Sequence, residues 1–205
     1  MNLPNKITMS RIFIVPVFML FVIPFPNWML ESSLLYFIKP QLVSINDFII
    51  NFGNYIAAGI FILAASTDGV DGYIARKRKL VTTMGKFLDP IADKLLVTAA
   101  LIALVQRNDV TGWAAMLIIS REFIVTGLRL VAVGEGIVIS ASSLGKIKTV
   151  TQIVAIAATL LKNFPLDLFT KFPFDKYAML AAVFITLYSL YDYIKKHISI
   201  LNFDS

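Results

Sequence analysis

Residues 48–93 read FIINFGNYIAAGIFILAASTDGVDGYIARKRKLVTTMGKFLDPIAD, an apolar run that ends in four aspartates and five basic residues. Apolar sequence resumes directly after this charged stretch. A helix needs about 20 apolar residues to cross the roughly 30 Å hydrocarbon core of a bilayer. Across the chain, 58% of the 205 residues are hydrophobic, only 16% are charged, and the mean hydropathy is +0.77. The sequence therefore predicts an all-α integral membrane protein.

The apolar runs predict six transmembrane helices within a single domain that spans residues 1–205. Pro16, Pro24 and Pro26 should kink the first helix or end it early. The stretch before it is expected to form a short interfacial helix near the lipid headgroups, although a simple topogenic flank explains it equally well. The interfacial residues would be Asn5, Thr8 and Arg11. The six helices are expected at about residues 10–30, 47–75, 85–106, 111–133, 144–162 and 176–195.

Lysine and arginine gather on one side of these predicted helices, and such an excess marks the cytoplasmic side. We therefore expect a multi-pass protein of the cell membrane, with both termini and the charged stretch facing the cytoplasm. The richer side holds Lys6, Arg11, Arg76, Lys77, Arg78, Lys79, Lys86, Lys146, Lys148, Lys195 and Lys196, against Lys39, Arg107, Lys162 and Lys171 on the other.

Composition also excludes several kinds of chemistry. The chain has no cysteine, which rules out disulfides, thiolate metal sites and a cysteine nucleophile. The lone His197 lies in a polar tail and is expected to have no chemical role. The net charge of +6 comes from bases at the ends of apolar runs, which indicates lipid headgroups or phosphates as partners rather than nucleic acid. The N-terminus lacks the order of a cleaved signal, so we expect it to be retained.

The four aspartates of the charged stretch are spaced to share helix faces. Asp68 and Asp71 are three apart and Asp89 and Asp93 are four apart, so each pair falls on one side of its helix. Two helices joined by a basic turn could aim all four carboxylates into one space. Ionised carboxylates this close repel one another, and near lipid each carries a large desolvation cost. One or two bound divalent cations resolve both problems, and an all-oxygen ligand set favours Mg²⁺ or Mn²⁺.

Small residues accompany the aspartates. Gly72 and Ala75 follow the first pair and Gly85 precedes the second, which leaves helix faces where a ligand can approach the backbone. Arg76 is suited to meet a phosphate. Solvated flanks explain Lys77 to Lys79, and helix packing is the usual role of small residues in membrane helices. Neither alternative explains four phased aspartates with glycines between them, so we infer a metal-bridged phosphorylated ligand.

The string D-x-x-D-G-x-x-A-R-x(8)-G-x-x-x-D-x-x-x-D resembles the signature of the CDP-alcohol phosphotransferase family at all eight defining positions. Here these positions are Asp68, Asp71, Gly72, Ala75, Arg76, Gly85, Asp89 and Asp93. The resemblance implies that the hydroxyl of an acceptor alcohol attacks the β-phosphate of a CDP-activated donor and releases CMP. It implies that Asp68, Asp71 and Asp89 hold metal, with two ions in the site, and that Asp93 adds a ligand and acts as general base. Gly72, Ala75 and Gly85 would line the cytidine site, and Arg76 would contact the diphosphate.

Charges inside the later apolar runs point to the acceptor, because intramembrane charge is functional by default. Arg129, Lys146 and Lys148 would suit a second phosphate, which makes the acceptor a phosphomonoester. Arg121 lies eight residues before Arg129, close to the same face, and is a further candidate. Two alternatives stay open: the lysines could be ordinary membrane anchors, and Arg121 with Glu122 could form a structural ion pair.

Three further segments resemble one branch of the family, the bacterial phosphatidylglycerophosphate synthases. They are NLPNKITMSRI near the N-terminus, REFIVTGLR and GKIKTVTQ. This likeness implies CDP-diacylglycerol and sn-glycerol 3-phosphate as substrates, membrane lipids as surroundings and a homodimer. Another acceptor, namely inositol phosphate, serine or phosphatidylglycerol, would keep the same chemistry. A divalent-cation transporter is the distant alternative, but it would place its acids near the bilayer midplane rather than at helix ends.

Overall fold

The computed structural model describes the backbone of residues 3–32, 37–78, 83–134 and 143–197. Within these ranges, side chains are described at residues 9–32, 37–67, 91–92, 94–134 and 144–196. Throughout the described residues the chain is helical or loop, with no strand, as the sequence predicts. The chain divides into two compact units, residues Met1–Arg107 and Asn108–Ser205.

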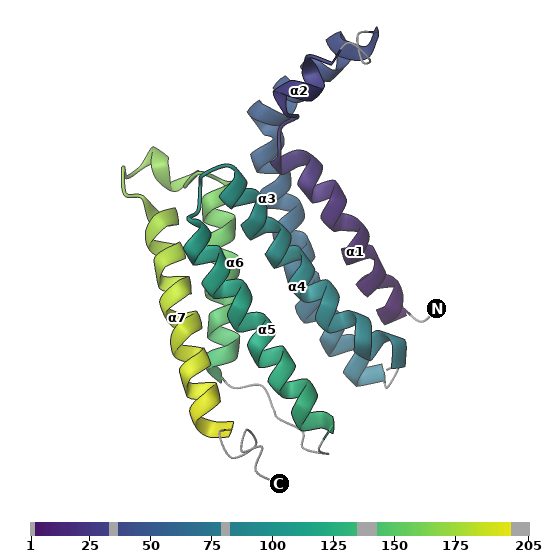
Figure 1. The fold of residues 1–205 in the computed structure, drawn as a ribbon, viewed down its shortest axis with the longest axis vertical. Coiled ribbons are helices and arrows are strands. Elements are labelled where there is room, and N and C mark those ends of the chain that lie inside the picture. Colours follow the sequence, from purple (N-terminus) through teal and green to yellow (C-terminus); the bar gives the residue numbers. More distant parts are fainter. Residues whose placement is uncertain (1–2, 33–36, 79–82, 135–142, 198–205) are drawn as a thin grey trace. The chain divides into compact units, whose positions relative to one another are not determined.

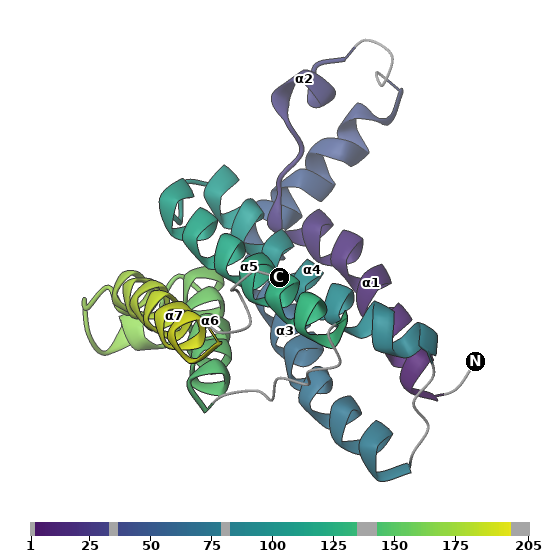
Figure 2. The same ribbon diagram turned by 60° about the horizontal axis from the view of Figure 1, so that its bottom comes forward.

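Unit 1 is a bundle in which α1 packs against both α3 and α4 (Figure 1). Figure 2 shows the same neighbours from below. Helix α1 begins at the end of the unit where α3 finishes and α4 starts. The described backbone of this unit therefore carries Lys6, Arg76, Lys77, Arg78 and Lys86, all expected on the cytoplasmic side, toward that end. The helices of this unit are α1 (Leu3–Val22), the short α2 (Asn27–Leu30), α3 (Lys39–Arg78) and α4 (Thr83–Gln106).

Helix α1 ends earlier than the predicted span, as expected from the prolines in this segment. It continues through Pro16 but ends at Val22, two residues before Pro24, because a proline disfavours helical backbone at the residue that precedes it. Its other end corrects a prediction. The helix is continuous from Leu3, so the N-terminal stretch is part of α1 and not a separate interfacial helix.

Helix α3 begins at Lys39, eight residues before the predicted start at about 47. Pro40 fits the first turn of a helix, where its missing N–H is not needed. Farther along, the side chain of Asn46 is buried and its Oδ1 accepts a hydrogen bond of 2.8 Å from the backbone N–H of Phe25. A polar residue thus fastens the early part of α3 to the loop after α1.

Helices α1 and α3 approach each other closely at Gly53. A Cβ atom at this position would lie 2.3 Å from the backbone oxygen of Phe21 and 3.2 Å from Cγ2 of Ile49. Only a residue without a side chain fits such a contact, which is how small residues allow close packing of membrane helices. Beside it, Phe18 of α1 packs on Phe61 of α3, with ring centroids 6.2 Å apart. This contact fixes the spacing of the two helices.

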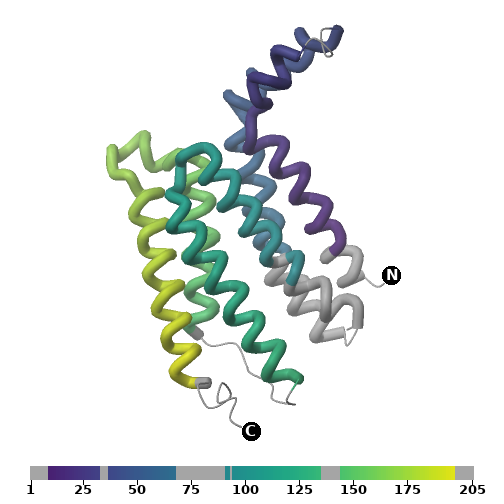
Figure 3. The backbone as a smooth tube through the Cα atoms, in the orientation of Figure 1, coloured from purple at the N-terminus to yellow at the C-terminus, as the bar shows by residue number. Residues whose placement is uncertain are grey.

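Unit 2 is organised around its last helix, because α7 packs against both α5 and α6. Figure 3 shows that α5 and α7 run in the same direction while α6 runs in the opposite one. The elements are α5 (Gly112–Gly134), α6 (Ser143–Leu160), the 3₁₀ turn η2 (Leu166–Leu168) and α7 (Phe174–His197). Their bounds lie within two residues of the predicted helices at 111–133, 144–162 and 176–195.

The turn after α6 is fixed by Asn163, whose φ of 64° is a left-handed conformation that asparagine tolerates better than most residues. Its Oδ1 accepts a hydrogen bond of 2.7 Å from the backbone N–H of Asp175, in the first turn of α7. Its Nδ2 donates one of 2.8 Å to Oδ1 of the same aspartate. Asn163 therefore ends one helix and caps the next.

Two segments of the described residues are long and apolar enough to cross a membrane, Lys39–Thr67 and Phe174–Lys196. Only 33% and 28% of their most apolar stretches are buried, whereas the core helix of a soluble protein is mostly buried. Large apolar side chains are exposed on both units, among them Phe13, Leu63, Leu130 and Phe184. Apolar surface of this extent marks an interaction with lipid or with another protein.

Candidate active site

Both halves of the aspartate signature lie on helical backbone. The first half is on the last turns of α3 and the second on the first turns of α4, so both lie at the same end of unit 1 (Figure 1). The helical backbone is what the three- and four-residue spacings of the aspartates require. The side chains lie outside the described residues at all eight positions: Asp68, Asp71, Gly72, Ala75, Arg76, Gly85, Asp89 and Asp93.

The donor set at this end of unit 1 fits a hard divalent cation. Carboxylate oxygens with no histidine or cysteine suit Mg²⁺ or Mn²⁺ and do not favour zinc or copper. Among the side chains that the structure describes, no group of three or more acidic, histidine or cysteine residues could hold a metal ion elsewhere. The signature aspartates are therefore the candidate metal ligands.

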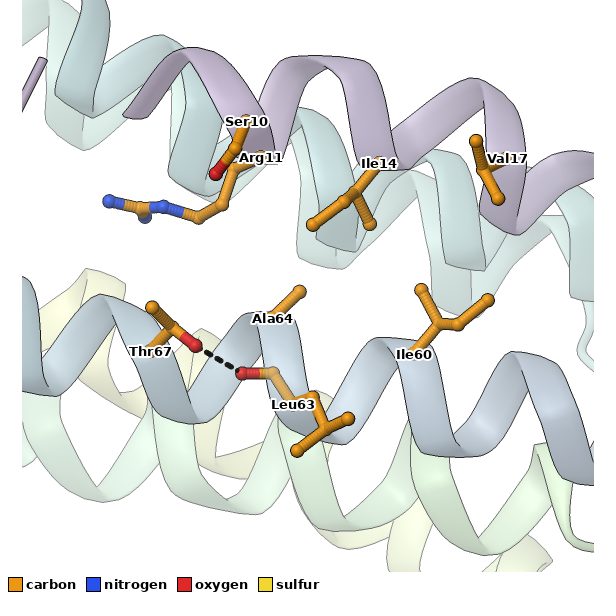
Figure 4. Close-up of a pocket in the computed structure, with 8 residues that line it drawn as sticks. All are labelled: Ser10, Arg11, Ile14, Val17, Ile60, Leu63, Ala64 and Thr67. Atoms are coloured by element: carbon orange, nitrogen blue, oxygen red, sulfur yellow. Dashed lines mark hydrogen bonds between the residues drawn. The ribbon is translucent and has the colours of Figure 1, made fainter. Parts of the chain in front are cut away.

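An apolar groove of about 260 Å³ lies next to the signature, between α1 and α3. Figure 4 shows it with Ile14 and Val17 on one wall and Ile60 and Ala64 on the other. Its far end is Thr67, the residue before the first signature aspartate. Its remaining lining residues are Ser10, Arg11 and Leu63.

Arg11 lies beside this groove with only 2% of its side chain exposed. In Figure 4 the side chain extends from α1 into the space between the two helices, toward the end where Thr67 lies. It is thus enclosed by protein, and its position near the headgroups stays a prediction. Asn5 and Thr8 belong to α1, and their side chains lie outside the described residues.

In unit 2, three charged residues meet between α5 and α6. Nζ of Lys148 donates a hydrogen bond to Oε1 of Glu122, and Nη1 of Arg121 lies 3.6 Å from the same oxygen. The side chains of Lys148, Arg121 and Glu122 are 5%, 6% and 14% exposed, so the carboxylate offsets two cations away from solvent. The sequence left open whether Arg121 binds a phosphate or forms a structural ion pair with Glu122, and these contacts support the ion pair.

The fourth charged residue of this cluster is Arg129, two turns farther along α5. Its guanidinium carbon lies 5.7 Å from the ring centroid of Tyr193 on α7, a cation–π contact. Its Nε is buried and has no hydrogen-bond partner among the described residues. Lys146 does not join the cluster. It is exposed, and it is two residues from the buried Lys148, which places the two lysines on opposite sides of α6.

Helix α7 contributes partners that the sequence did not single out. Nη2 of Arg121 donates a hydrogen bond of 2.8 Å to Oγ of Ser189, and Nε2 of Gln152 on α6 donates one of 2.9 Å to Oγ1 of Thr186. Thr186, Ser189 and Tyr193 are three and four residues apart and almost fully buried, so they form one polar stripe. That spacing within an otherwise apolar helix was the signal that could have found them.

The chain matches the model of the family described as CDP-alcohol phosphatidyltransferase over residues 1–188. It therefore belongs to the CDP-alcohol phosphatidyltransferase family, and the resemblance based on the aspartate signature is confirmed. A curated relative from Bacillus subtilis, named CDP-diacylglycerol--glycerol-3-phosphate 3-phosphatidyltransferase, is 49% identical over 96% of this chain and 95% of its own. A relative of the same name from Rickettsia bellii is 34% identical over 95% of this chain and 94% of its own.

A third relative, from Mycobacterium tuberculosis, has the name "Probable phosphatidylglycerophosphate synthase". It is 35% identical over 95% of this chain and 81% of its own length. These relatives cover both units of the chain, and their names agree with the branch of the family that the sequence resembles.

Proposed function

We propose that this protein is an enzyme that transfers the phosphatidyl group of CDP-diacylglycerol to sn-glycerol 3-phosphate, giving phosphatidylglycerophosphate and CMP. The observation that carries the proposal is the near full-length similarity to relatives of that name, at 49% identity in one case, together with all eight signature positions. The apolar groove beside the signature also suits a substrate that carries acyl chains.

In the reaction, a hydroxyl oxygen of glycerol 3-phosphate attacks the β-phosphorus of the CDP-lipid. A new P–O bond forms to the acceptor, the bond between the β-phosphorus and the bridging oxygen breaks, and CMP leaves with that oxygen. Asp93 takes the hydroxyl proton as general base. Arg76 contacts the diphosphate, and Gly72, Ala75 and Gly85 leave room for the cytidine.

The metal site is proposed at Asp68, Asp71 and Asp89, with Asp93 as a further ligand and two Mg²⁺ or Mn²⁺ ions. When bound, such ions neutralise the charge of the diphosphate and of the departing CMP. Four carboxylates carry the charge that balances two divalent ions, which lowers the energetic cost of placing either near lipid.

The phosphate of the acceptor is proposed to bind in unit 2. Support comes from Lys148, which is buried, and from Arg129, whose Nε is buried against α7, because a charge inside a membrane helix bundle has a functional role by default. Arg121, which contacts Glu122, is the further candidate beside them. Lys146, exposed on the other side of α6, is the weakest member of the predicted set.

A single catalytic domain over residues 1–205 with six membrane spans is proposed, with both termini and the active site at the cytoplasmic face. Support comes from the distribution of lysine and arginine along the sequence, which is richer at the span ends that would face the cytoplasm. A homodimer in the cell membrane is proposed on the family resemblance alone.

The first experiment measures CMP release by the purified protein in detergent with CDP-diacylglycerol, Mg²⁺ and each candidate acceptor in turn. Release with glycerol 3-phosphate, and not with inositol phosphate, serine or phosphatidylglycerol, is expected. Release with a different acceptor would support a CDP-alcohol phosphotransferase reaction but show that glycerol 3-phosphate is not the acceptor.

The same assay tests the general base. Asp93→Asn should nearly abolish CMP release, because the amide cannot take the hydroxyl proton, while binding of CDP-diacylglycerol persists. Lys94→Gln changes the neighbouring residue, and it should keep its activity because no catalytic role falls on that position. Normal turnover of Asp93→Asn would remove Asp93 from the mechanism.

A further inference from the structure

We propose that Tyr193 of α7 is a positioning residue for acceptor binding, which holds Arg129 in place for the phosphate of glycerol 3-phosphate. This inference rests on the proposed function. The signature lies on α3 and α4, and the predicted acceptor-binding residues lie on α5 and α6. The inference therefore gives α7, the last helix, a role in the reaction.

The contact between the two residues has the geometry of a cation–π interaction. The guanidinium carbon of Arg129 lies 5.7 Å from the ring centroid, within the distance of about 6 Å over which such an attraction acts. Tyr193 is only 3% exposed, so solvent does not screen the attraction. The ring thus orients a long side chain that would otherwise sample many rotamers.

The group that holds each cation decides how much of its positive charge remains for a ligand. Lys148 and Arg121 share the carboxylate of Glu122, which neutralises charge and occupies N–H groups. A ring face holds Arg129 without neutralising its charge, because the ring has no net charge, and Nε of Arg129 has no hydrogen-bond partner among the described residues. Arg129 is therefore the member of the cluster best prepared to bind an added phosphate.

Tyr193 lies beyond the part of the chain that the family model matches. The match to the family model ends at residue 188, and the two α7 residues that contact arginines of α5, Ser189 and Tyr193, follow it. Chemistry common to the family lies in the signature of α3 and α4. Recognition of one particular acceptor can depend on residues outside the shared region.

The test compares Tyr193→Leu, which removes the ring, with Tyr193→Phe, which keeps the ring and removes the hydroxyl. Tyr191→Leu is the matched control, because Tyr191 lies on the same helix with 63% of its surface exposed. Two quantities are measured: KM for glycerol 3-phosphate, and the inhibition constant of inorganic phosphate competing with that acceptor. The loss of one cation–π contact should raise both about three- to tenfold in Tyr193→Leu.

In Tyr193→Leu, kcat and KM for CDP-diacylglycerol should stay within about twofold of wild type. Tyr193→Phe should retain most of the phosphate affinity, and Tyr191→Leu should behave as wild type. In an Arg129→Ala background, Tyr193→Leu should add no further increase, because the cation that it positions is gone. If Tyr193→Leu does not fold, Tyr193→Met removes the ring with a flexible side chain that fills the space.

Several results would overturn the proposal. One is an unchanged acceptor KM and phosphate inhibition in Tyr193→Leu. Another is a common loss of kcat, of both KM values and of thermal stability, which would indicate a purely structural residue. A third is equal damage in the Phe and Leu variants, which would implicate the hydroxyl. If the wild-type protein releases no CMP with glycerol 3-phosphate, the proposed function fails first, and the two failures are distinguishable.

Discussion

Replacement of Gly53 by alanine tests the close approach of α1 and α3. The added Cβ would lie 2.3 Å from the backbone oxygen of Phe21, and ordinary contact begins at 3.4 Å, so the helices must separate by about 1 Å. Forcing one methyl group into a packed interface costs about 1–3 kcal/mol. Alanine favours the helix over glycine by about 1 kcal/mol, which offsets part of that cost. The expected net loss of stability is up to about 2 kcal/mol.

Gly59→Ala is the matched control, because Gly59 lies on the same helix and a Cβ there meets nothing within 4 Å. Both variants gain the same helix propensity, so the difference between them isolates the clash. Thermal unfolding in detergent should show Gly53→Ala melting about 2–12 °C below Gly59→Ala, which corresponds to 1–3 kcal/mol in a chain of this size. Equal melting temperatures would show that α1 and α3 do not approach as closely as the structure has them.

Two further predictions concern contacts within unit 2. Glu122→Gln should destabilise the protein by about 3–5 kcal/mol, because it leaves the buried charge of Lys148 without a carboxylate partner. Lys148→Met should cost less, because Arg121 still lies 3.6 Å from Glu122, and the double variant should lose less than the sum of the two single losses. Thermal unfolding of the three variants measures this coupling, and simply additive losses would argue against the pair. At the turn before α7, Asn163→Gly removes the cap but tolerates the left-handed φ, while Asn163→Ala also strains it. Melting temperatures should therefore fall in the order wild type, Gly, Ala, and an Ala variant as stable as the Gly variant would contradict the role of φ.

The helical content and most helix bounds could be predicted because long apolar runs have one stable solution in a membrane. The early start of α3 could not. Polar residues around Asn46 look like a loop in the sequence, yet they are helical, and the Asn46 side chain is held by a hydrogen bond from the Phe25 backbone, 21 residues away, which the sequence does not reveal. The continuity of α1 was missed for a similar reason, since a change in polarity along a helix does not by itself interrupt the backbone.

Part of the candidate site could likewise be predicted from the sequence, and part could not. The phasing of the four aspartates is local information, so the sequence alone was enough to predict them as metal ligands. The environment of Arg121 was left open, because it depends on contacts among three helices whose rotation about their axes the sequence does not specify. Glu122 is adjacent to Arg121, but Ser189 is 68 residues away, and Lys148, which binds the same carboxylate, lies 26 residues from Glu122. Such contacts depend on how helices pack, and helix periodicity restricts only which face each residue occupies.

If the acceptor phosphate binds in unit 2, as proposed, the charges there bear on the choice of acceptor. Arg121, Arg129 and Lys148 contribute three positive charges and Glu122 one negative charge, which leaves two positive charges in this cluster of described residues. A phosphomonoester carries between about 1.5 and 2 negative charges near neutral pH, and it would neutralise them. Serine has no net charge, and the phosphodiester of phosphatidylglycerol has a single one, so either would leave positive charge uncompensated in a region of low dielectric. The cluster therefore favours a phosphomonoester such as glycerol 3-phosphate. It does not separate glycerol 3-phosphate from inositol phosphate, which has the same charged group. That distinction depends on the shape of the acceptor around its hydroxyls, and a direct comparison of the two acceptors in the CMP-release assay measures it.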